Sequence, residues 1–352
     1  MSAQWSRVSS PVRASIEALS VLYLASYVPY ATLTRWLATV PYAPLGRPLS
    51  GLEVLPAVII LSAVMTYTFI WVSGWWRQAH TLRLFGASLP CPTRWTFLSG
   101  IGAALLLFTV PLSFTFRNVS IPFMQLLMRG DVLIVAPLVD MLLGRRVRWY
   151  SWLALLLVAI GLSVTIDARG GLHLGSLAIV TVVLYTLGYM LRILAMTRIA
   201  KSGNARVTQG YFVEEQMVAI PLALAGLAAL SAMHWGTQGS QLQFGFIDSW
   251  HTGQLPYFVV LAGLLFFISI FAVLILLDRR ENTFCVPFER SASVLAGLAA
   301  TYILAAMKLS PTPSAAEVVG ALLLIAAIAV LSVTPRMLAA RQSSSASNPA
   351  TE

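Results

Sequence analysis

Residues 255–277 read LPYFVVLAGLLFFISIFAVLILL and contain no charged side chain. A helix of about 20 apolar residues is long enough to cross the roughly 30 Å hydrocarbon core of a bilayer. Residues 149–166 form a second uncharged block, WYSWLALLLVAIGLSVTI. Both blocks therefore predict membrane-spanning helices.

The composition of the whole chain agrees with these two blocks. Of its 352 residues, 58% are hydrophobic and only 10% are charged, and the mean hydropathy is +0.80. Soluble domains carry about 25% charged residues, because ionisable groups must cover their surface. The composition excludes a pair of soluble domains and predicts an all-α, polytopic membrane protein.

The apolar blocks divide into ten expected spans, and the basic residues outside them orient the chain. The expected spans are centred near Tyr27, Leu61, Leu106, Leu133, Leu157, Val183, Leu222, Phe266, Leu298 and Ile325. Fifteen basic residues fall in loops on the side of the N-terminus and four on the other side. The positive-inside rule then places both termini in the cytoplasm. This bias also explains the net charge of +10 without a nucleic-acid partner, so membrane lipid is the expected surrounding.

Two further expectations concern location and processing. No secretory signal peptide is expected in residues 1–15, because they contain no apolar core, so the first span acts as the uncleaved signal. Of the 23 basic residues, 21 are arginine, which indicates a GC-rich genome and favours a bacterial inner membrane.

Short sequence matches indicate an internal repeat. Val21-Leu22-Tyr23 and Tyr27 recur as Val183-Leu184-Tyr185 and Tyr189, and Ile121-Pro122-Phe123 recurs as Val286-Pro287-Phe288. Chance similarity in an apolar chain is the alternative. With five helices in each repeat the second unit is inverted, as in many transporters. We expect one repeat in residues 1–170, a second in residues 171–336, and a disordered cytoplasmic tail in residues 337–352.

A longer motif lies in the stretch from Ser120 to Thr165. It contains Gln125, Arg129 and Gly130, then Leu143-Gly144-Arg145-Arg146, then Gly161. This pattern resembles the drug/metabolite transporter superfamily, in its EamA-like and nucleotide-sugar-transporter-like branches. The resemblance implies ten helices in two inverted five-helix repeats. Arg145 stands where small-amine exporters of that superfamily typically have Glu.

Polar side chains inside the expected spans are candidates for solute binding, because charge near the bilayer centre needs a partner or a polar cavity. A guanidinium fork suits carboxylate or phosphate oxygens, and stripes of tyrosine can line a cavity. The candidate binding residues are Gln125, Arg129, Arg290, Tyr27, Tyr30, Tyr189 and Arg192. Two alternatives stay open: Arg129 pairs with a carboxylate only to lock the bundle, and the tyrosines form an interfacial belt.

Four acidic residues in the spans are candidates for proton coupling or charge pairing. They are Asp131, Glu214, Glu215 and Glu289. A helical position two residues away points about 200° round the axis, so Arg129 and Asp131 cannot share one stripe. Glu214 and Glu215 are adjacent, and we expect one to pair with Arg192 or Arg290. An interfacial cap facing cytoplasmic water is the alternative for this pair.

Motifs for covalent or metal catalysis are missing from the sequence. The two cysteines, Cys91 and Cys285, have no metal-ligand spacing, and the four histidines are scattered. We expect residues 233–254 to be a loop without catalytic content, and we expect no cofactor and no bound metal.

The sequence therefore favours a secondary transporter of a small polar organic solute, either an anionic metabolite or a sugar-containing one, working by exchange or proton coupling. A membrane-embedded enzyme or accessory subunit acting on lipid-linked sugars is the alternative, and a channel is a third. The sequence leaves a monomer and a homodimer both open.

Overall fold

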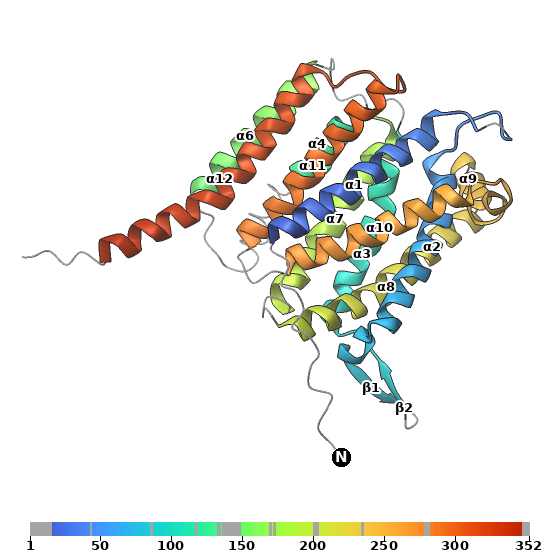
Figure 1. Ribbon diagram of the computed structural model, residues 1–352, viewed down its shortest axis with the longest axis horizontal. Helices are drawn as coiled ribbons and strands as arrows, with labels where there is room; N and C mark the ends of the chain where they lie inside the picture. Colours follow the sequence, from blue (N-terminus) through green and yellow to red (C-terminus); the bar gives the residue numbers. More distant parts are fainter. Residues whose placement is uncertain are drawn as a thin grey trace, which may run out of the picture.

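The structure is a computed structural model, and it describes residues 16–42, 44–84, 87–116, 119–131, 135, 149–168, 171, 174–199, 204–233, 236–277 and 282–346. Helices make up most of this part of the chain (Figure 1). The expected all-α class is confirmed.

The α-helices are α1 (Ile16–Thr39), α2 (Gly51–Val72), α3 (Arg94–Ser113), α4 (Ile121–Gly130), α6 (Trp149–Ala168), α7 (Ser176–Ile199), α8 (Ala205–Ala232), α9 (Gly236–Phe246), α10 (Leu255–Leu276), α11 (Asn282–Ala306) and α12 (Ala315–Ala346). The shorter elements are the 3-10 helices η1 (Trp75–Gln78) and η2 (Asp248–His251) and the strands β1 (Thr81–Leu84) and β2 (Ala87–Pro90).

Nine of the ten expected span centres lie inside α-helices of 20 residues or more. The other centre, Leu133, lies outside the described residues, shortly after α4. Five helices of the described part, α2, α3, α7, α8 and α10, are both long and apolar enough to cross a bilayer. Helices of this kind are typical of membrane proteins, because a helix satisfies its own backbone hydrogen bonds in lipid.

The interior is mainly apolar, but the structure also exposes large apolar side chains and buries several charged ones. Trp152 and Leu156 of α6 are 60% and 56% exposed, and Val183 of α7 is 52% exposed. In contrast, Glu215 and Arg290 are completely buried. Lys, Glu, Arg and Asp are almost never fully buried unless paired, so the interior charges need a structural or functional explanation.

The helices pack in two groups with the same pattern of neighbours. α1 lies against α10, which also contacts α2, and α7 lies against α3, which also contacts α8. α6 pairs with α12 at one edge of the molecule, and α11 lies between α12 and α1 (Figure 1). The backbones of α3 and α7 approach so closely that a Cβ atom on Gly102 would lie 2.4 Å from the carbonyl oxygen of Gly188. Small residues permit such close packing between membrane helices.

The segment expected as a loop at residues 233–254 is mostly helical, so that expectation was wrong. It contains α9 and η2, and α9 packs on α2 and α8. The buried face of α9 consists of Gly239, Leu242 and Gly245. Two of these three are glycines, which add little hydrophobicity, so the helical spacing of the buried residues is not visible in the hydropathy of the sequence. At Gly245 a Cβ atom would lie 2.7 Å from the carbonyl oxygen of Glu53, so only glycine permits this contact.

A β-hairpin that the sequence analysis did not anticipate lies between α2 and α3. β1 and β2 pair antiparallel, with Leu82 opposite Leu89 (Figure 1). Each strand has only four residues, so their alternation is too short to stand out in an apolar chain.

The tail assigned to residues 337–352 also differs from expectation. Residues 337–346 continue α12, and residues 347–352 lie outside the described part. The continuation contains Leu338, Ala339, Ala340 and Arg341, which are strong helix formers.

A capping box starts α2 at the end of the molecule opposite the hairpin. The Ser50 side chain accepts a hydrogen bond from the Glu53 amide, and the Glu53 carboxylate accepts one from the Ser50 amide. Arg47 binds the same carboxylate with both terminal nitrogens, at 2.9 and 2.7 Å. These bonds raise the pKa of Arg47 above its ordinary value, so it stays charged. The first turn of α2 is thereby held in place.

Candidate functional site: a buried cluster of arginine, carboxylate and tyrosine

Charged and phenolic side chains from four helices meet in the interior of the bundle. The helices are α1, α4, α7 and α11, and α4 continues into Asp131, its C-cap residue. Every member of the group is at most 4% exposed. We call this group the central cluster; it consists of Tyr23, Tyr27, Arg129, Asp131, Tyr185, Tyr189, Glu289 and Arg290.

Arg129 connects three helices within the central cluster. Its Nη2 donates a hydrogen bond to the Tyr27 hydroxyl at 2.9 Å, and its Nη1 donates one to the Tyr185 hydroxyl. The carboxylate of Glu289 on α11 lies 4.0 Å from Nη1. Arg129 therefore faces the interior of the bundle, as the sequence predicted.

Arg290 enters the same space from α11. Its Nη1 also donates to the Tyr185 hydroxyl, and its Nη2 lies 3.7 Å from a carboxylate oxygen of Asp131. The centre of its guanidinium lies 3.4 Å from the centroid of the Tyr189 ring, which is a cation–π contact. Two guanidiniums thus converge on one phenol oxygen.

The charges of α4 and α11 balance across the two helices and, between the adjacent Glu289 and Arg290, also along α11, where Nε of Arg290 lies 3.6 Å from Oε2 of Glu289. Arg129 faces Glu289, and Arg290 faces Asp131. The expectation that Arg129 and Asp131 do not neutralise each other along one stripe agrees with this arrangement. Glu289 also accepts a hydrogen bond of 2.7 Å from the Tyr23 hydroxyl. The described part of the cluster contains two basic and two acidic side chains.

Several buried polar atoms of the central cluster have no hydrogen-bond partner within the described part of the chain. They are Nε of Arg129, Nε and Nη2 of Arg290, Oε2 of Glu289 and the hydroxyl of Tyr189. Leaving a buried donor or acceptor without a partner costs roughly 1–3 kcal/mol. The cluster therefore offers several donors and one carboxylate oxygen to a polar ligand.

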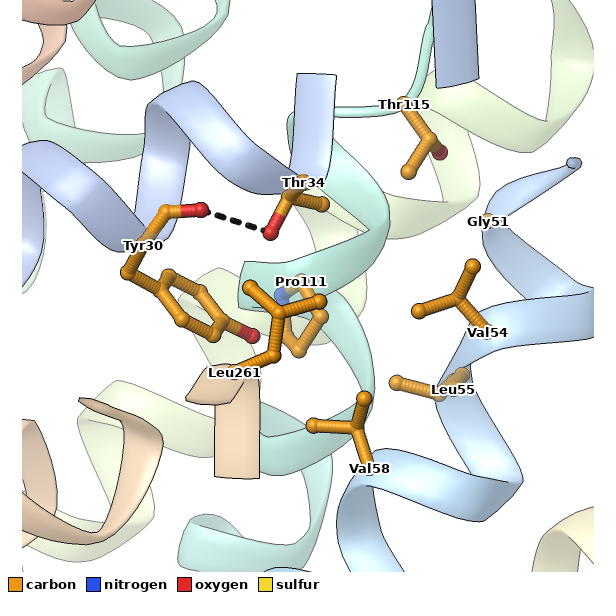
Figure 2. Close-up of a pocket in the computed structure, with 9 residues that line it drawn as sticks. All are labelled: Tyr30, Thr34, Gly51, Val54, Leu55, Val58, Pro111, Thr115 and Leu261. Carbon is orange, nitrogen blue, oxygen red and sulfur yellow. Dashed lines mark hydrogen bonds between the residues drawn. The ribbon is translucent and has the colours of Figure 1, made fainter. Parts of the chain in front are cut away.

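Gln125 and Tyr30 lie next to this cluster, and both contact the C-terminal end of α3. Gln125 is fully buried, its Nε2 lies 3.5 Å from the Ser113 hydroxyl, and its aliphatic part faces Gly297 of α11. Tyr30 follows Tyr27 by one turn of α1, and the rings of both tyrosines contact Phe114, edge-on. Tyr30 also lines a small pocket at the end of the bundle opposite the hairpin, between α1, α2, α3 and α10 (Figure 2).

A second polar group is centred on two glutamates of α8, and each glutamate binds a different set of partners. We call it the α8 cluster; it consists of Glu214 and Glu215 with His80, Thr93, Thr96, Ser99, Arg192 and Tyr211.

Glu215 forms a complete ion pair within the α8 cluster. Both of its oxygens accept hydrogen bonds from Arg192, each at 2.8 Å. One oxygen also accepts bonds from the hydroxyls of Ser99 at 2.7 Å and Tyr211 at 2.9 Å. The predicted pairing of one α8 glutamate with Arg192 is confirmed.

Glu214 holds both ends of the hairpin. One oxygen accepts from the His80 amide at 2.8 Å and lies 2.7 Å from the His80 ring nitrogen Nδ1. The other accepts from the Thr93 amide at 3.2 Å and the Thr96 hydroxyl at 2.7 Å. Beside it, a Cβ atom on Gly210 would lie 2.4 Å from the Gln78 carbonyl oxygen, so the chain before the hairpin lies directly on α8.

Arg35, near the end of α1, contacts the segment between α3 and α4. Its Nη1 donates to the carbonyl oxygens of Phe114 at 3.4 Å and of Phe116, and its Nη2 to that of Val119 at 3.3 Å. Arg35 therefore links α1 to the C-terminal end of α3, away from the hairpin.

The expected site residues separate into these groups. The structure brings Tyr27, Arg129, Asp131, Tyr189, Glu289 and Arg290 together, and it places Arg192, Glu214 and Glu215 in the α8 cluster. Tyr23 and Tyr185 were part of the expected stripes but not of the candidate binding set. Both bind charged members of the central cluster, and their spacing of four residues from Tyr27 and Tyr189 was the available signal. Across the described ranges, no group of three His, Cys, Asp or Glu is arranged to hold a metal ion.

Comparisons with known proteins add little to this geometry. No family model matches the chain. No curated protein matches it. One solved structure, described only as "Crystal structure of protein", is similar over 93% of this chain and 99% of its own, at 15% identity and a TM-score of 0.49. A likeness at that score carries no argument about fold or function.

Proposed function

We propose that this chain is a secondary transporter that moves a small polar organic solute across a membrane by alternating access. The observation that carries the proposal is the central cluster, in which two arginines and two carboxylates are buried between helices and several polar atoms have no hydrogen-bond partner among the described residues. Such residues inside membrane helices typically mark solute or ion pathways.

The packing of the helices supports two inverted five-helix repeats. If α1 corresponds to α7, and α2 and α3 to α8 and α10, then the contact of α1 with α10 corresponds to the contact of α7 with α3. The contact of α2 with α10 likewise corresponds to that of α8 with α3. This correspondence follows the same division as the sequence matches around Tyr23 and Tyr185. Inverted repeats give inward-open and outward-open states of similar energy.

On the sequence resemblance around Gln125 and Arg129 and on the arginine-rich composition, the proposal is a ten-span member of the drug/metabolite transporter superfamily in a bacterial inner membrane. Both termini and the hairpin would then lie in the cytoplasm. In this arrangement the exposed Arg94 and Arg198 lie on the cytoplasmic side, as the positive-inside rule favours.

The two clusters take different parts in the proposed transport. Arg129 and Arg290 bind acceptor oxygens of the solute, and Tyr189 stacks beneath the guanidinium of Arg290. Glu289 and Asp131 compete with the solute for the same arginines, so they are the groups that would take up a coupling proton. Glu215 is already compensated by Arg192, and it serves in charge pairing.

A binding screen tests the proposal most directly. The purified protein is assayed for thermal stabilisation, and in proteoliposomes for uptake, with amino acids, phosphorylated sugars, nucleotide sugars and amines. We expect at least one class to bind, and Arg290→Gln to abolish its uptake. Arg198→Gln is the matched control, because Arg198 is exposed and lies against Trp95 outside both clusters.

Two results would overturn the proposal. One is a panel in which nothing binds together with a cellular phenotype that survives Arg129→Ala and Arg290→Ala. The other is a reporter fused after Glu352 that is active only outside the cytoplasm, which would exclude the topology.

A further inference from the structure

Two connections between helices cross from one packing group to the other, at opposite ends of the molecule. The segment from α2 to α3 contains η1 and the hairpin, and it leads from the group of α1, α2 and α10 to the group of α3, α7 and α8. The segment from α8 to α10 contains α9 and η2, and it leads back. Figure 1 shows the hairpin at one end of the bundle and α9 at the other. Each segment follows the second helix of its repeat, so the proposed inverted repeat makes them counterparts.

The segment after α2 is held against α8 of the other group. A Cβ atom on Gly210 of α8 would lie 2.4 Å from the carbonyl oxygen of Gln78, so η1 lies directly on that helix. The ring of Trp75 in η1 lies between the groups, with centroid distances of 5.0 Å to Phe69 of α2 and 5.7 Å to Phe212 of α8. We call these contacts, with the bonds of Glu214, the hairpin latch; it consists of Trp75, Gln78, His80 and Thr93 against Gly210, Phe212 and Glu214.

The segment after α8 is held against α2 in a corresponding way. A Cβ atom on Gly245 of α9 would lie 2.7 Å from the carbonyl oxygen of Glu53, so α9 lies directly on the first turn of α2. Leu242 of α9 is 2% exposed and packs in one apolar cluster with Leu55 of α2 and Leu227 of α8. Helix α9 therefore contacts one helix of each group. We call these contacts the α9 latch; it consists of Leu242 and Gly245 against Leu52, Glu53, Leu55 and Leu227.

The central cluster lies on the boundary that both latches span. Helix α1 belongs to one group and α7 to the other, and Arg129 donates hydrogen bonds to Tyr27 of α1 and to Tyr185 of α7. Every member of the cluster is at most 4% exposed, so the structure is closed toward both ends. Separating the two groups at one end would admit a solute to the cluster from that end. At each end, one of the latches joins the groups.

We propose that the hairpin latch and the α9 latch are the two gates of the transport cycle, that each closes one side of the membrane, and that they open one at a time. This inference rests on the proposed transport function and adds which contacts decide the side toward which the central cluster opens. A change that weakens one latch raises the population of the state open at that end, because the state in which this latch stays closed loses the contact energy. Weakening the two latches therefore has opposite effects.

One type of substitution tests both latches. Gly210→Ala and Gly245→Ala each add one Cβ atom against a backbone carbonyl oxygen, at 2.4 and 2.7 Å. Gly226→Ala in α8 is the matched control, because its Cβ atom would meet no neighbouring group within 4 Å among the described residues. All three glycines lie in helices and gain the same helix propensity from alanine. The crowding of a latch is therefore the difference between the variants and their control.

Labelling of a buried thiol from each side of the membrane measures which gate is open. Ser293 of α11 is completely buried, and its hydroxyl donates to the carbonyl oxygen of Arg290. Ser293→Cys therefore places a thiol beside the central cluster, and Cys91→Ser with Cys285→Ser makes it the single thiol of the chain. The full-length protein is labelled with a membrane-impermeant maleimide in right-side-out and in inside-out membrane vesicles.

We expect the two latch variants to speed labelling from opposite sides. Gly210→Ala should raise the labelling rate from the hairpin side, which is exposed in inside-out vesicles, by about tenfold, because crowding a packed contact is costly. Gly245→Ala should raise the rate from the other side by a similar factor. Gly226→Ala should label as slowly as the parent. If a glycine variant does not fold, Trp75→Ala weakens the hairpin latch and Leu242→Ala the α9 latch by removing contacts, with the same expectations.

Other outcomes separate this inference from the proposed function. If both latch variants speed labelling from the same side, or if neither differs from Gly226→Ala, the two gates are wrong, and transport still stands if the solute panel gives a binding class. If the sides are exchanged, the latches are confirmed and the cytoplasmic hairpin is wrong. If labelling is specific to opposite sides but no solute of the panel binds, the proposed function fails while the two latches stand, because labelling requires no solute.

Discussion

The central cluster and the α8 cluster both contain arginine and buried carboxylates, yet they differ in how completely these carboxylates are bonded. Each carboxylate oxygen of Glu214 has two close polar partners. One oxygen of Glu215 accepts three hydrogen bonds, and the other accepts one from Arg192. In the central cluster, Glu289 faces its arginines at 3.6 and 4.0 Å, beyond hydrogen-bonding distance.

This difference separates a structural role from a binding role. A fully bonded buried ion pair holds two helices in one arrangement, and losing either partner strands a charge. A partly bonded group keeps donors and acceptors for a ligand, at a cost in stability. We therefore expect substitutions in the α8 cluster to reduce stability and substitutions in the central cluster to reduce transport.

The largest expected effect is on stability in the α8 cluster. Glu215→Ala leaves the guanidinium of Arg192 buried without its partner, and we expect a loss of about 3–5 kcal/mol of unfolding free energy. The measurement is reversible unfolding in detergent micelles. The double variant Arg192→Leu with Glu215→Leu serves as control and should recover most of the loss. A loss below about 1 kcal/mol for Glu215→Ala would contradict the structural role.

The next effect is a loss of transport in the central cluster. The double variant Arg290→Gln with Asp131→Asn removes one positive and one negative charge, which lie 3.7 Å apart. The net charge of the cluster therefore stays the same. We expect solute affinity to fall about 100-fold, which corresponds to about 2.7 kcal/mol. Because both charges are removed together, neither stays buried without its partner, and the unfolding free energy should not fall by as much as the loss of about 3–5 kcal/mol expected for Glu215→Ala. A large loss of stability with unchanged transport would reverse the distinction between the clusters.

A smaller effect is expected where Glu214 holds the hairpin. Glu214→Gln places an amide group against the donors of Thr93 or His80, and we expect a local loss of about 1–3 kcal/mol. Hydrogen exchange of residues 80–93 measures it directly, and protection there should fall while α10 is unaffected. His80→Ala is the milder comparison, because it removes the ring nitrogen and keeps the backbone amide. Equal loss of protection in both variants would show that the ring contact, rather than the amides, holds the hairpin.

Much of the fold followed from hydropathy, because a helix in lipid must be long and apolar. Nine of the expected span centres lie in helices, and in the described part of the chain five of these helices are long and apolar enough to cross a bilayer. Helix α9 did not follow from hydropathy, because two of the three residues on its buried face are Gly239 and Gly245. Glycine has no side chain, so a close backbone contact at a glycine gives no signal on a hydropathy scale. Such contacts nevertheless decide how closely α9 approaches α2.

The candidate site was predictable in its members but not in its pairing. Arg129 and Glu289 were noticeable because charges inside apolar helices are costly. Their pairing depends on how α4 and α11 lie against each other, which one sequence does not specify. The same limit applies to Glu214, two of whose partners are the backbone amides of His80 and Thr93 on either side of the hairpin. Backbone donors have no residue type, so no sequence motif identifies them.

The smallest expected effect compares one phenol hydroxyl in each cluster. The Tyr211 hydroxyl donates to Glu215 at 2.9 Å, and the Tyr23 hydroxyl donates to Glu289 at 2.7 Å. Tyr→Phe at either site removes a single buried hydrogen bond, with a cost of about 1 kcal/mol. Because Glu215 keeps Arg192 and Ser99, Tyr211→Phe should lower only the unfolding free energy. Glu289 keeps no bond of comparable length, so Tyr23→Phe should also change solute affinity and its dependence on pH. The unfolding free energy and the solute affinity can be measured on the same preparations. If the two variants behave identically, the missing hydrogen bonds of the central cluster do not distinguish it from the α8 cluster.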